Sequence, residues 1–148
     1  MLIVLNHKMN LTKEEVVAYE KIIREKTYDD TLVVCPSIAY LPYFQGENYK
    51  LGSQIVSQYD GGSHTGEVSA KQLRSLNVSH CLVGHSETRK DHNETELELN
   101  KKIKVLLKNG IIPILCIGET QEERDQNKAE DVLTRDLRNC LRELSKEE

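Results

Sequence analysis

The stretch CLVGHSETRK, residues 81–90, joins an apolar run to a glycine, a histidine and a group of charged residues. The apolar residues are typical of a buried strand, and the residues after His85 are typical of a helix start. In parallel α/β folds, functional side chains gather where the strands end. The stretch therefore predicts a strand that leads directly into a helix, with His85 at the junction and directed towards a ligand.

Similar apolar runs recur along the chain, and strands are expected at residues 2–5, 31–35, 49–56, 80–84 and 111–117. Three helices are predicted from apolar side chains at helical spacing, and a capping box at 12–15 marks the start of the first. Only weak helices are expected after the second and third strands. The buried helix faces are predicted to contain Val16, Tyr19, Ile22 and Ile23, then Leu99, Ile103, Leu106 and Leu107, and finally Val132, Leu133, Leu137, Cys140, Leu141 and Leu144.

Continuous apolar strands that alternate with helices predict an α/β fold with a parallel sheet covered by helices. Five strand–helix units fit an open doubly wound sheet, and they fit five-eighths of a (β/α)8 barrel equally well. Periodicity alone does not separate these two folds. Residues 1–148 are expected to form a single domain, because no linker or low-complexity segment interrupts them.

The composition excludes several classes of function. A net charge of −4 gives no basic surface for nucleic acid or a membrane. No stretch approaches the ~18 apolar residues of a membrane span, and the N-terminal apolar run is too short for a signal peptide. The four cysteines form no CxxC pair, so reduced and buried thiols in a cytoplasmic protein are expected, without a disulfide or a bound metal. They are Cys35, Cys81, Cys116 and Cys140.

Candidate functional groups follow three of the expected strands. They are Asn6 and Lys8 after the first, His85 and Glu87 after the fourth, and Cys116, Gly118 and Glu119 after the fifth. A lysine together with a histidine favours an anionic, carbonyl-bearing small molecule as ligand. Structural roles are open for each: Lys8 as a solvated loop charge, His85 as a helix-start residue, and Glu87 as a carboxylate near the positive helix end. No dinucleotide, P-loop or serine-hydrolase motif is present.

Taken together, five segments resemble the triosephosphate isomerase family in order and spacing. They are NHKMN (6–10), VVCPSIAYL (33–41), HTGEVSAKQL (64–73), VGHSETR (83–89) and ILCIGET (114–120). Any one of these segments alone would be a weak signal. Their combination across the whole chain implies the first five β/α units of a TIM barrel.

The resemblance also implies roles for the candidate residues. Lys8 would bind the triose phosphate and stabilise developing negative charge, and Asn6 would position Lys8. His85 would polarise the substrate carbonyl as a neutral imidazole and move protons between the two substrate oxygens. Glu87 would be the acid beside that site. The implied reaction interconverts dihydroxyacetone phosphate and glyceraldehyde 3-phosphate, with no cofactor or metal.

This sequence departs from the family pattern in three places. Thr88 replaces the first arginine of the family's G-H-S-E-R-R signature, and Glu94 stands where the family often has an acid that pairs with that arginine. The segment GSQIVS, residues 52–57, replaces the usual G-A-Q-N. The family's base-bearing segment, Y-E-P-V-W-A-I-G-T-G, has no counterpart here, and the later phosphate-binding loops are also absent.

An incomplete barrel is expected to need a partner, because open sheet edges and an exposed interior favour association. The favoured hypothesis is the N-terminal part of a split isomerase that is inactive alone and is completed by a chain carrying strands six to eight. A truncated fragment of the enzyme, or a non-catalytic assembly module derived from it, are the alternatives. The long loop at residues 56–67 is expected to mediate self-association, with Thr65, Gly66 and Glu67 at the interface.

Overall fold

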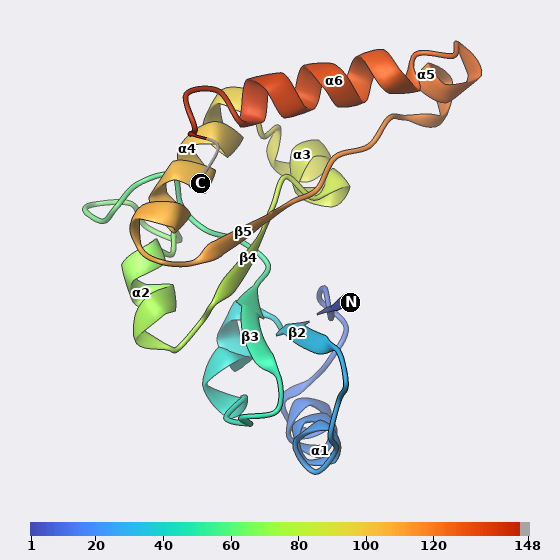
Figure 1. Ribbon diagram of the computed structural model, residues 1–148. Helices are drawn as coiled ribbons and strands as arrows, with labels where there is room; N and C mark the ends of the chain where they lie inside the picture. The colour runs from blue at the N-terminus through green and yellow to red at the C-terminus, as the bar shows by residue number, and fades with distance from the viewer. Residues whose placement is uncertain (146–148) are drawn as a thin grey trace.

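A five-stranded parallel sheet forms the centre of the chain in the computed structural model, which describes residues 1–145 (Figure 1). The strands are β1 (Leu2–Asn6), β2 (Thr31–Cys35), β3 (Lys50–Ser53), β4 (His80–Val83) and β5 (Ile112–Leu115). They pair strictly in chain order, β1-β2-β3-β4-β5. A doubly wound sheet reverses its strand order at a switch point, whereas a barrel does not. The fold is therefore an incomplete β/α barrel, as the family resemblance predicted.

Helices connect the parallel strands and cover the outer face of the curved sheet. They are α1 (Lys13–Arg24), the 3₁₀ helix η1 (Ile38–Tyr43), α2 (Ala70–Ser75), α3 (Ser86–His92), α4 (Glu96–Lys108), α5 (Gln121–Asp125) and α6 (Ala129–Cys140). The short η1 and α2 confirm the weak helices expected after the second and third strands. Figure 1 shows α5 at the far end of α6, away from the sheet. Within residues 1–145, no helix combines the length and apolar character needed to cross a membrane.

Helix starts are set by local side-chain chemistry. The predicted capping box is present in α1, where the Thr12 hydroxyl accepts from the backbone N–H of Glu15 and the Glu15 carboxylate accepts from the backbone N–H of Thr12. The same reciprocal arrangement begins α2, α4 and α5, at Ser69, Thr95 and Thr120. These caps satisfy backbone donors that have no partner within the helix, and they fix where each helix leaves its loop.

Two apolar layers lie on opposite faces of the sheet. The larger layer lies between sheet and helices and includes fully buried Val34, Leu73 and Ile103. The smaller layer lies on the inner face and contains buried Val33, Cys35 and Leu82. A Cβ at Gly52 would lie 2.4 Å from the Cys35 Sγ, so the inner layer requires glycine there. The inner layer is small because five strands enclose only part of a barrel interior.

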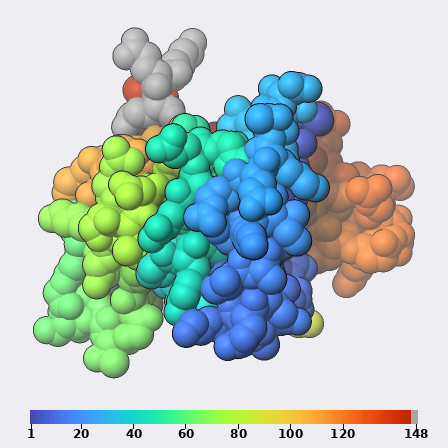
Figure 2. All heavy atoms as spheres, turned by 90° about the horizontal axis from the view of Figure 1, so that it is seen from below, coloured from blue at the N-terminus to red at the C-terminus, as the bar shows by residue number. Residues whose placement is uncertain are grey.

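Both edges of the sheet are open in the described chain. Within residues 1–145, β1 pairs only with β2, and β5 pairs only with β4. Side chains at these edges are correspondingly exposed, with Leu2 at 50% and Ile112 at 56%. Figure 2 shows the first units side by side in chain order, with the orange residues around α5 projecting from one side. The expected need for a partner at the edges therefore has a structural basis.

Three predicted features of the buried faces and strands were wrong in detail. Ile22 is exposed, because α1 instead directs Glu20 inward, where its carboxylate accepts a hydrogen bond of 2.9 Å from the Tyr49 hydroxyl. Leu137 and Leu141 are also exposed, because α6 instead buries the side of the helix that contains Val132, Asp136 and Cys140. Strand β3 ends at Ser53 instead of continuing to residue 56.

The imidazole ring of His7 lies among aromatic rings, and within residues 1–145 its nitrogens have no hydrogen-bond partner. Its ring centroid is 4.7 Å from that of Tyr19 and 5.8 Å from that of Phe44, both edge-on. Both ring nitrogens are buried without a partner, and burial lowers the pKa of His7. Protonation is therefore easier in the unfolded chain than in the folded one. The stability contributed by neutral His7 is complete above pH ~6.5 and is lost as the pH falls through the lowered folded pKa.

Replacing His7 with phenylalanine should stabilise the fold, most strongly under mildly acidic conditions. Phenylalanine keeps the aromatic packing and removes two buried polar atoms that lack partners, so the free energy of unfolding at pH 5.5 should rise by about 1 kcal/mol. Urea denaturation between pH 5 and 8 measures this change. The exposed His92→Gln variant is the matched control. If the free energy of unfolding of His7→Phe depended on pH as it does in the unmodified chain, the prediction would be contradicted.

Candidate active site

The carboxyl ends of the strands bring four predicted site residues around one pocket of ≈420 Å³. Asn6 ends β1 and Lys8 follows it, while His85 and Glu87 follow β4. Leu82, on the inner face of β4, lies at the base of the same pocket. Residues far apart in sequence meet here because parallel strands direct their carboxyl ends to the same rim.

Lys8 has an unusual backbone conformation, with φ of 53°. Left-handed backbone costs a non-glycine residue of order 1–3 kcal/mol and persists only where neighbours hold it. Two side chains do so. The backbone N–H of Lys8 donates to the Asn6 Oδ1 at 3.0 Å, and its carbonyl oxygen accepts from the Gln54 Nε2 at 3.0 Å. The hydrogen bond to Asn6 is a contact through which Asn6 could position Lys8, as the resemblance implied. Gln54 is an additional partner that was not predicted from the sequence.

The side chains of Lys8 and Glu87 form an ion pair across the pocket, with 2.7 Å between Nζ and Oε1. The hydrogen bond from Lys8 is the main cause of the lowered pKa of Glu87. These side chains are 47% and 53% exposed, so the pair adds little to stability. Its effect is to hold the ammonium of Lys8 towards the pocket rather than towards bulk solvent.

His85 caps the first turn of α3 through its own ring. The Nδ1 atom accepts a hydrogen bond of 3.3 Å from the backbone N–H of Glu87. In this contact the backbone N–H donates and Nδ1 accepts, and the Glu87 Oε2 lies 3.4 Å from the same nitrogen. Both contacts engage Nδ1, so Nε2 is the ring nitrogen left for a ligand. This explains why the strand stops at a histidine that leads straight into a helix.

The third predicted cluster lies in a neighbouring pocket of ≈390 Å³ that also includes His85. Burial raises the pKa of Cys116, so its thiol stays protonated and packs against the inner layer. The Glu119 carboxylate pairs with Arg124. Gly118 shares this pocket, and none of the three lines the pocket that contains Lys8.

Arg89 connects the site to the rest of the fold. Its Nε donates to the Gly84 carbonyl at 2.8 Å, and a terminal nitrogen donates to the Cys116 carbonyl at 3.2 Å. The guanidinium also lies 3.7 Å from the carboxylate of Asp136, which is buried in α6. One side chain thus joins the ends of β4 and β5 to the final helix.

The loop predicted to mediate self-association extends away from this site. Thr65, Gly66 and Glu67 are all exposed, and Gly66 has φ of 89°. The base of the loop is held by an ion pair of 2.5 Å between Asp60 and Lys108. Thr65 lines neither pocket described above, so within its own chain it takes no part in the Lys8 site.

The comparisons with known proteins agree with this geometry. The family model described as triosephosphate isomerase matches residues 1–148. The chain belongs to the triosephosphate isomerase family. Triosephosphate isomerases of Clostridium botulinum (strain Loch Maree / Type A3) and Clostridium tetani are 40% and 37% identical to it, each over 97% of this chain. The enzyme of Mesomycoplasma hyorhinis is 35% identical, also over 97% of the chain.

The chain spans about 60% of the length of these triosephosphate isomerases, with 60% for the C. botulinum protein and 63% for that of M. hyorhinis. The matched part corresponds to the five observed β/α units. The described pocket contains Lys8 and His85, the lysine and histidine for which the family resemblance predicted roles. The carboxylate base and the phosphate loops of the family lie outside the sequence described here.

Replacing Gln54 with alanine should release the backbone of Lys8. The Gln54 amide also donates to the Cys35 carbonyl at 2.9 Å, so it bridges β2 to the loop after β1. Its loss leaves two carbonyls without this donor and should destabilise the fold by about 1–3 kcal/mol. Urea denaturation and the NMR shifts of Lys8 measure the two effects. The half-buried Gln58→Ala variant, from the same loop region, serves as the control, and unchanged Lys8 shifts in Gln54→Ala would contradict the prediction.

Proposed function

We propose that this chain is the N-terminal part of a split triosephosphate isomerase and supplies the electrophile and the cationic group of its active site. The observation that supports this most directly is the shared pocket of Lys8 and His85, in which the backbone N–H of Glu87 holds the His85 ring by its Nδ1 atom. A second polypeptide would supply strands six to eight, the glutamate base and the phosphate loops. Interconversion of dihydroxyacetone phosphate and glyceraldehyde 3-phosphate would then proceed without a cofactor.

In the proposed reaction, the base from the second polypeptide removes a proton from the carbon next to the substrate carbonyl. The electron pair moves onto the carbonyl oxygen and forms an enediolate. His85 donates a hydrogen bond from Nε2 to that oxygen and passes the proton between the two substrate oxygens. The base then returns a proton to the neighbouring carbon, so that the composition is unchanged. Lys8 supplies fixed positive charge for the phosphate and the enediolate.

Reconstitution with a complement tests this proposal. The complement is the part of the C. botulinum enzyme beyond its matched region, about 100 residues judged from ~250 for a whole barrel. The two polypeptides are co-expressed and assayed for isomerisation of glyceraldehyde 3-phosphate. We expect a one-to-one complex that turns over substrate, and no turnover by this chain alone. A stable one-to-one complex without turnover would contradict the proposed activity.

Two controls assign the activity to the reconstituted site. A complement whose base glutamate is replaced by glutamine should bind equally well and lose turnover, which excludes contamination by the host enzyme. A truncated, non-functional fragment would fail to form a defined complex with any complement, including one encoded beside it in the genome.

We also propose a cytoplasmic location, which agrees with the four free cysteines and a reducing compartment.

We further propose that two copies associate through the loop at residues 56–67. Thr65, Gly66 and Glu67 would enter the pocket beside Lys8 in the neighbouring copy. Their exposure supports this, as does the stacking of Tyr59 on His64, whose ring centroids are 3.9 Å apart and which shapes the loop tip. Deletion of residues 60–66 should halve the mass of the assembly in light scattering. An unchanged mass would contradict this interface.

A further inference from the structure

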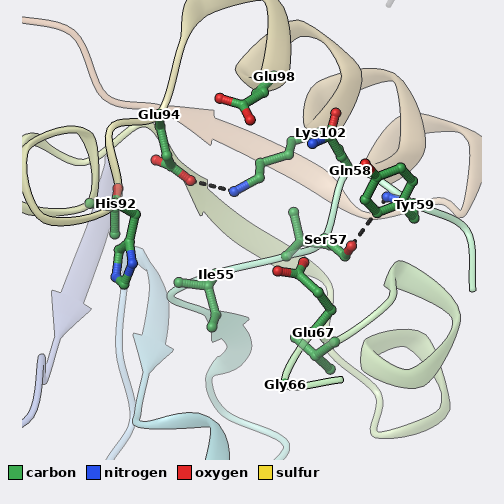
Figure 3. Close-up of a pocket in the computed structure, with 13 residues that line it drawn as sticks. Ile55, Ser57, Gln58, Tyr59, Gly66, Glu67, His92, Glu94, Glu98 and Lys102 are labelled. Carbon is green, nitrogen blue, oxygen red and sulfur yellow. Dashed lines mark hydrogen bonds and ion pairs between the residues drawn. The ribbon is translucent and has the colours of Figure 1, made fainter. Parts of the chain in front are cut away.

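A third pocket, distinct from the two described above, lies between the loop after β3 and the junction of α3 with α4 (Figure 3). Its volume is ≈280 Å³, and the proposed isomerase chemistry does not use it. The walls come from one chain, and the cavity is concave, as sites for small molecules are. Its polar lining consists mainly of Glu67, His92, Glu94, Glu98 and Lys102.

The charges around this pocket are not balanced. Three carboxylates, from Glu67, Glu94 and Glu98, face one ammonium, from Lys102. Figure 3 shows Lys102 directed to Glu94, and one oxygen of Glu94 accepts from it. The Glu98 carboxylate accepts from the backbone N–H and hydroxyl of Thr95 in the capping box. The lining therefore retains net negative charge after its internal ion pair is counted.

Glu94 has one oxygen that is buried and unused. Its side chain is 10% exposed, and Oε2 has no hydrogen-bond partner. A buried carboxylate oxygen without a donor costs about 1–3 kcal/mol or more, so a donor supplied by a ligand would be bound favourably. Thr88 does not fill this role, because its hydroxyl donates to the His85 carbonyl at 2.9 Å.

We propose that this pocket binds a small molecule that carries an alkylguanidinium group. Within residues 1–145, no group of three or more histidine, cysteine, aspartate or glutamate side chains is placed to hold a metal ion, which favours an organic cation. A guanidinium presents planar paired donors to a carboxylate and carries the positive charge that the lining lacks. The ring of Tyr59 also lies on the wall of this pocket, where it is stacked on His64.

Binding of ethylguanidinium to the chain in its native assembly tests the proposal, with ethylurea as the neutral ligand of matched shape. Isothermal titration and NMR shifts of Glu94 and Tyr59 are the measurements. We expect saturable binding of ethylguanidinium and at least tenfold weaker binding of ethylurea. Equal binding of the two ligands, absence of saturation, or tighter binding of ethylammonium or Mg²⁺ would overturn the proposal.

Two variants locate the ligand without depending on each other. Glu94→Gln should weaken ethylguanidinium binding at least fivefold. Thr88→Arg should abolish it, because an arginine at this position fills the pocket from the same chain, whereas Thr88→Ser should leave it unchanged. Thr88→Arg retains every buried carboxylate, so it remains informative if Glu94→Gln fails to fold. Unchanged binding in Thr88→Arg would overturn the assignment of the site.

Discussion

Replacement of His85 by glutamine is expected to lower kcat of the reconstituted isomerase by about 10²–10⁴-fold. Glutamine donates one hydrogen bond but does not exchange protons between the two substrate oxygens. In the proposed site the substrate phosphate would interact with Lys8 and the complement rather than with residue 85, so KM should change little. Steady-state assays in both directions of the reaction measure these constants.

The exposed Lys90→Gln variant, on the same helix α3, is the control for this experiment and should retain full kcat. The reconstituted complex should form equally well with His85→Gln, because the ring makes only one hydrogen bond of 3.3 Å within the described chain. Native-like kcat in His85→Gln would remove His85 from the reaction. That result would favour a non-catalytic assembly module.

Replacement of Arg89 by methionine is expected to lower the free energy of unfolding by about 3–5 kcal/mol, the typical cost of breaking a buried ion pair. The change leaves the buried Asp136 carboxylate with only the exposed Arg135 as a guanidinium partner, and it removes the donors to the Gly84 and Cys116 carbonyls. Methionine fills a similar volume, so the loss reports polar contacts more than packing. Urea denaturation measures the change.

The control for Arg89→Met is Arg138→Met, which removes an exposed arginine from α6. This variant should change stability by less than about 0.5 kcal/mol. The double variant Arg89→Met/Asp136→Leu should recover part of the loss, because it removes the buried carboxylate that faced Arg89. A loss below about 1 kcal/mol in Arg89→Met would show that the arginine does not hold the strand ends to α6.

The strands and the meeting of Lys8 with His85 could be predicted from the sequence, because both follow from local patterns. Buried parallel strands are continuous apolar runs, and their carboxyl ends share a rim whatever the loops do. The role of Gln54 was not predicted, because this residue lies within an apolar run that was interpreted as one strand from 49 to 56. Its role depends on two backbone carbonyls from other parts of the chain, at Lys8 in the loop after β1 and at Cys35 in β2.

Contacts between distant segments were the main limit of prediction. Arg89 was visible in the signature segment, but its partner Asp136 lies on a helix that no local pattern connects to it. The same holds for Glu94, whose partner is Lys102 on α4 instead of a residue at position 88. Ile22 is exposed although it was expected on the buried face, and Glu20 of the same helix is buried. Tyr49, from another unit, donates a hydrogen bond to the buried Glu20 carboxylate.

The two open edges, at β1 and β5, belong to one hydrogen-bonded sheet, so a single complement could pair with both. A complement that docked on β5, as proposed, would already be close to β1, so the second contact would form at a high effective concentration. Closure would thus be cooperative, and half-docked states would be sparsely populated. The melting temperature of the complex would then rise with the logarithm of the free complement concentration, as for any folded state stabilised by mass action.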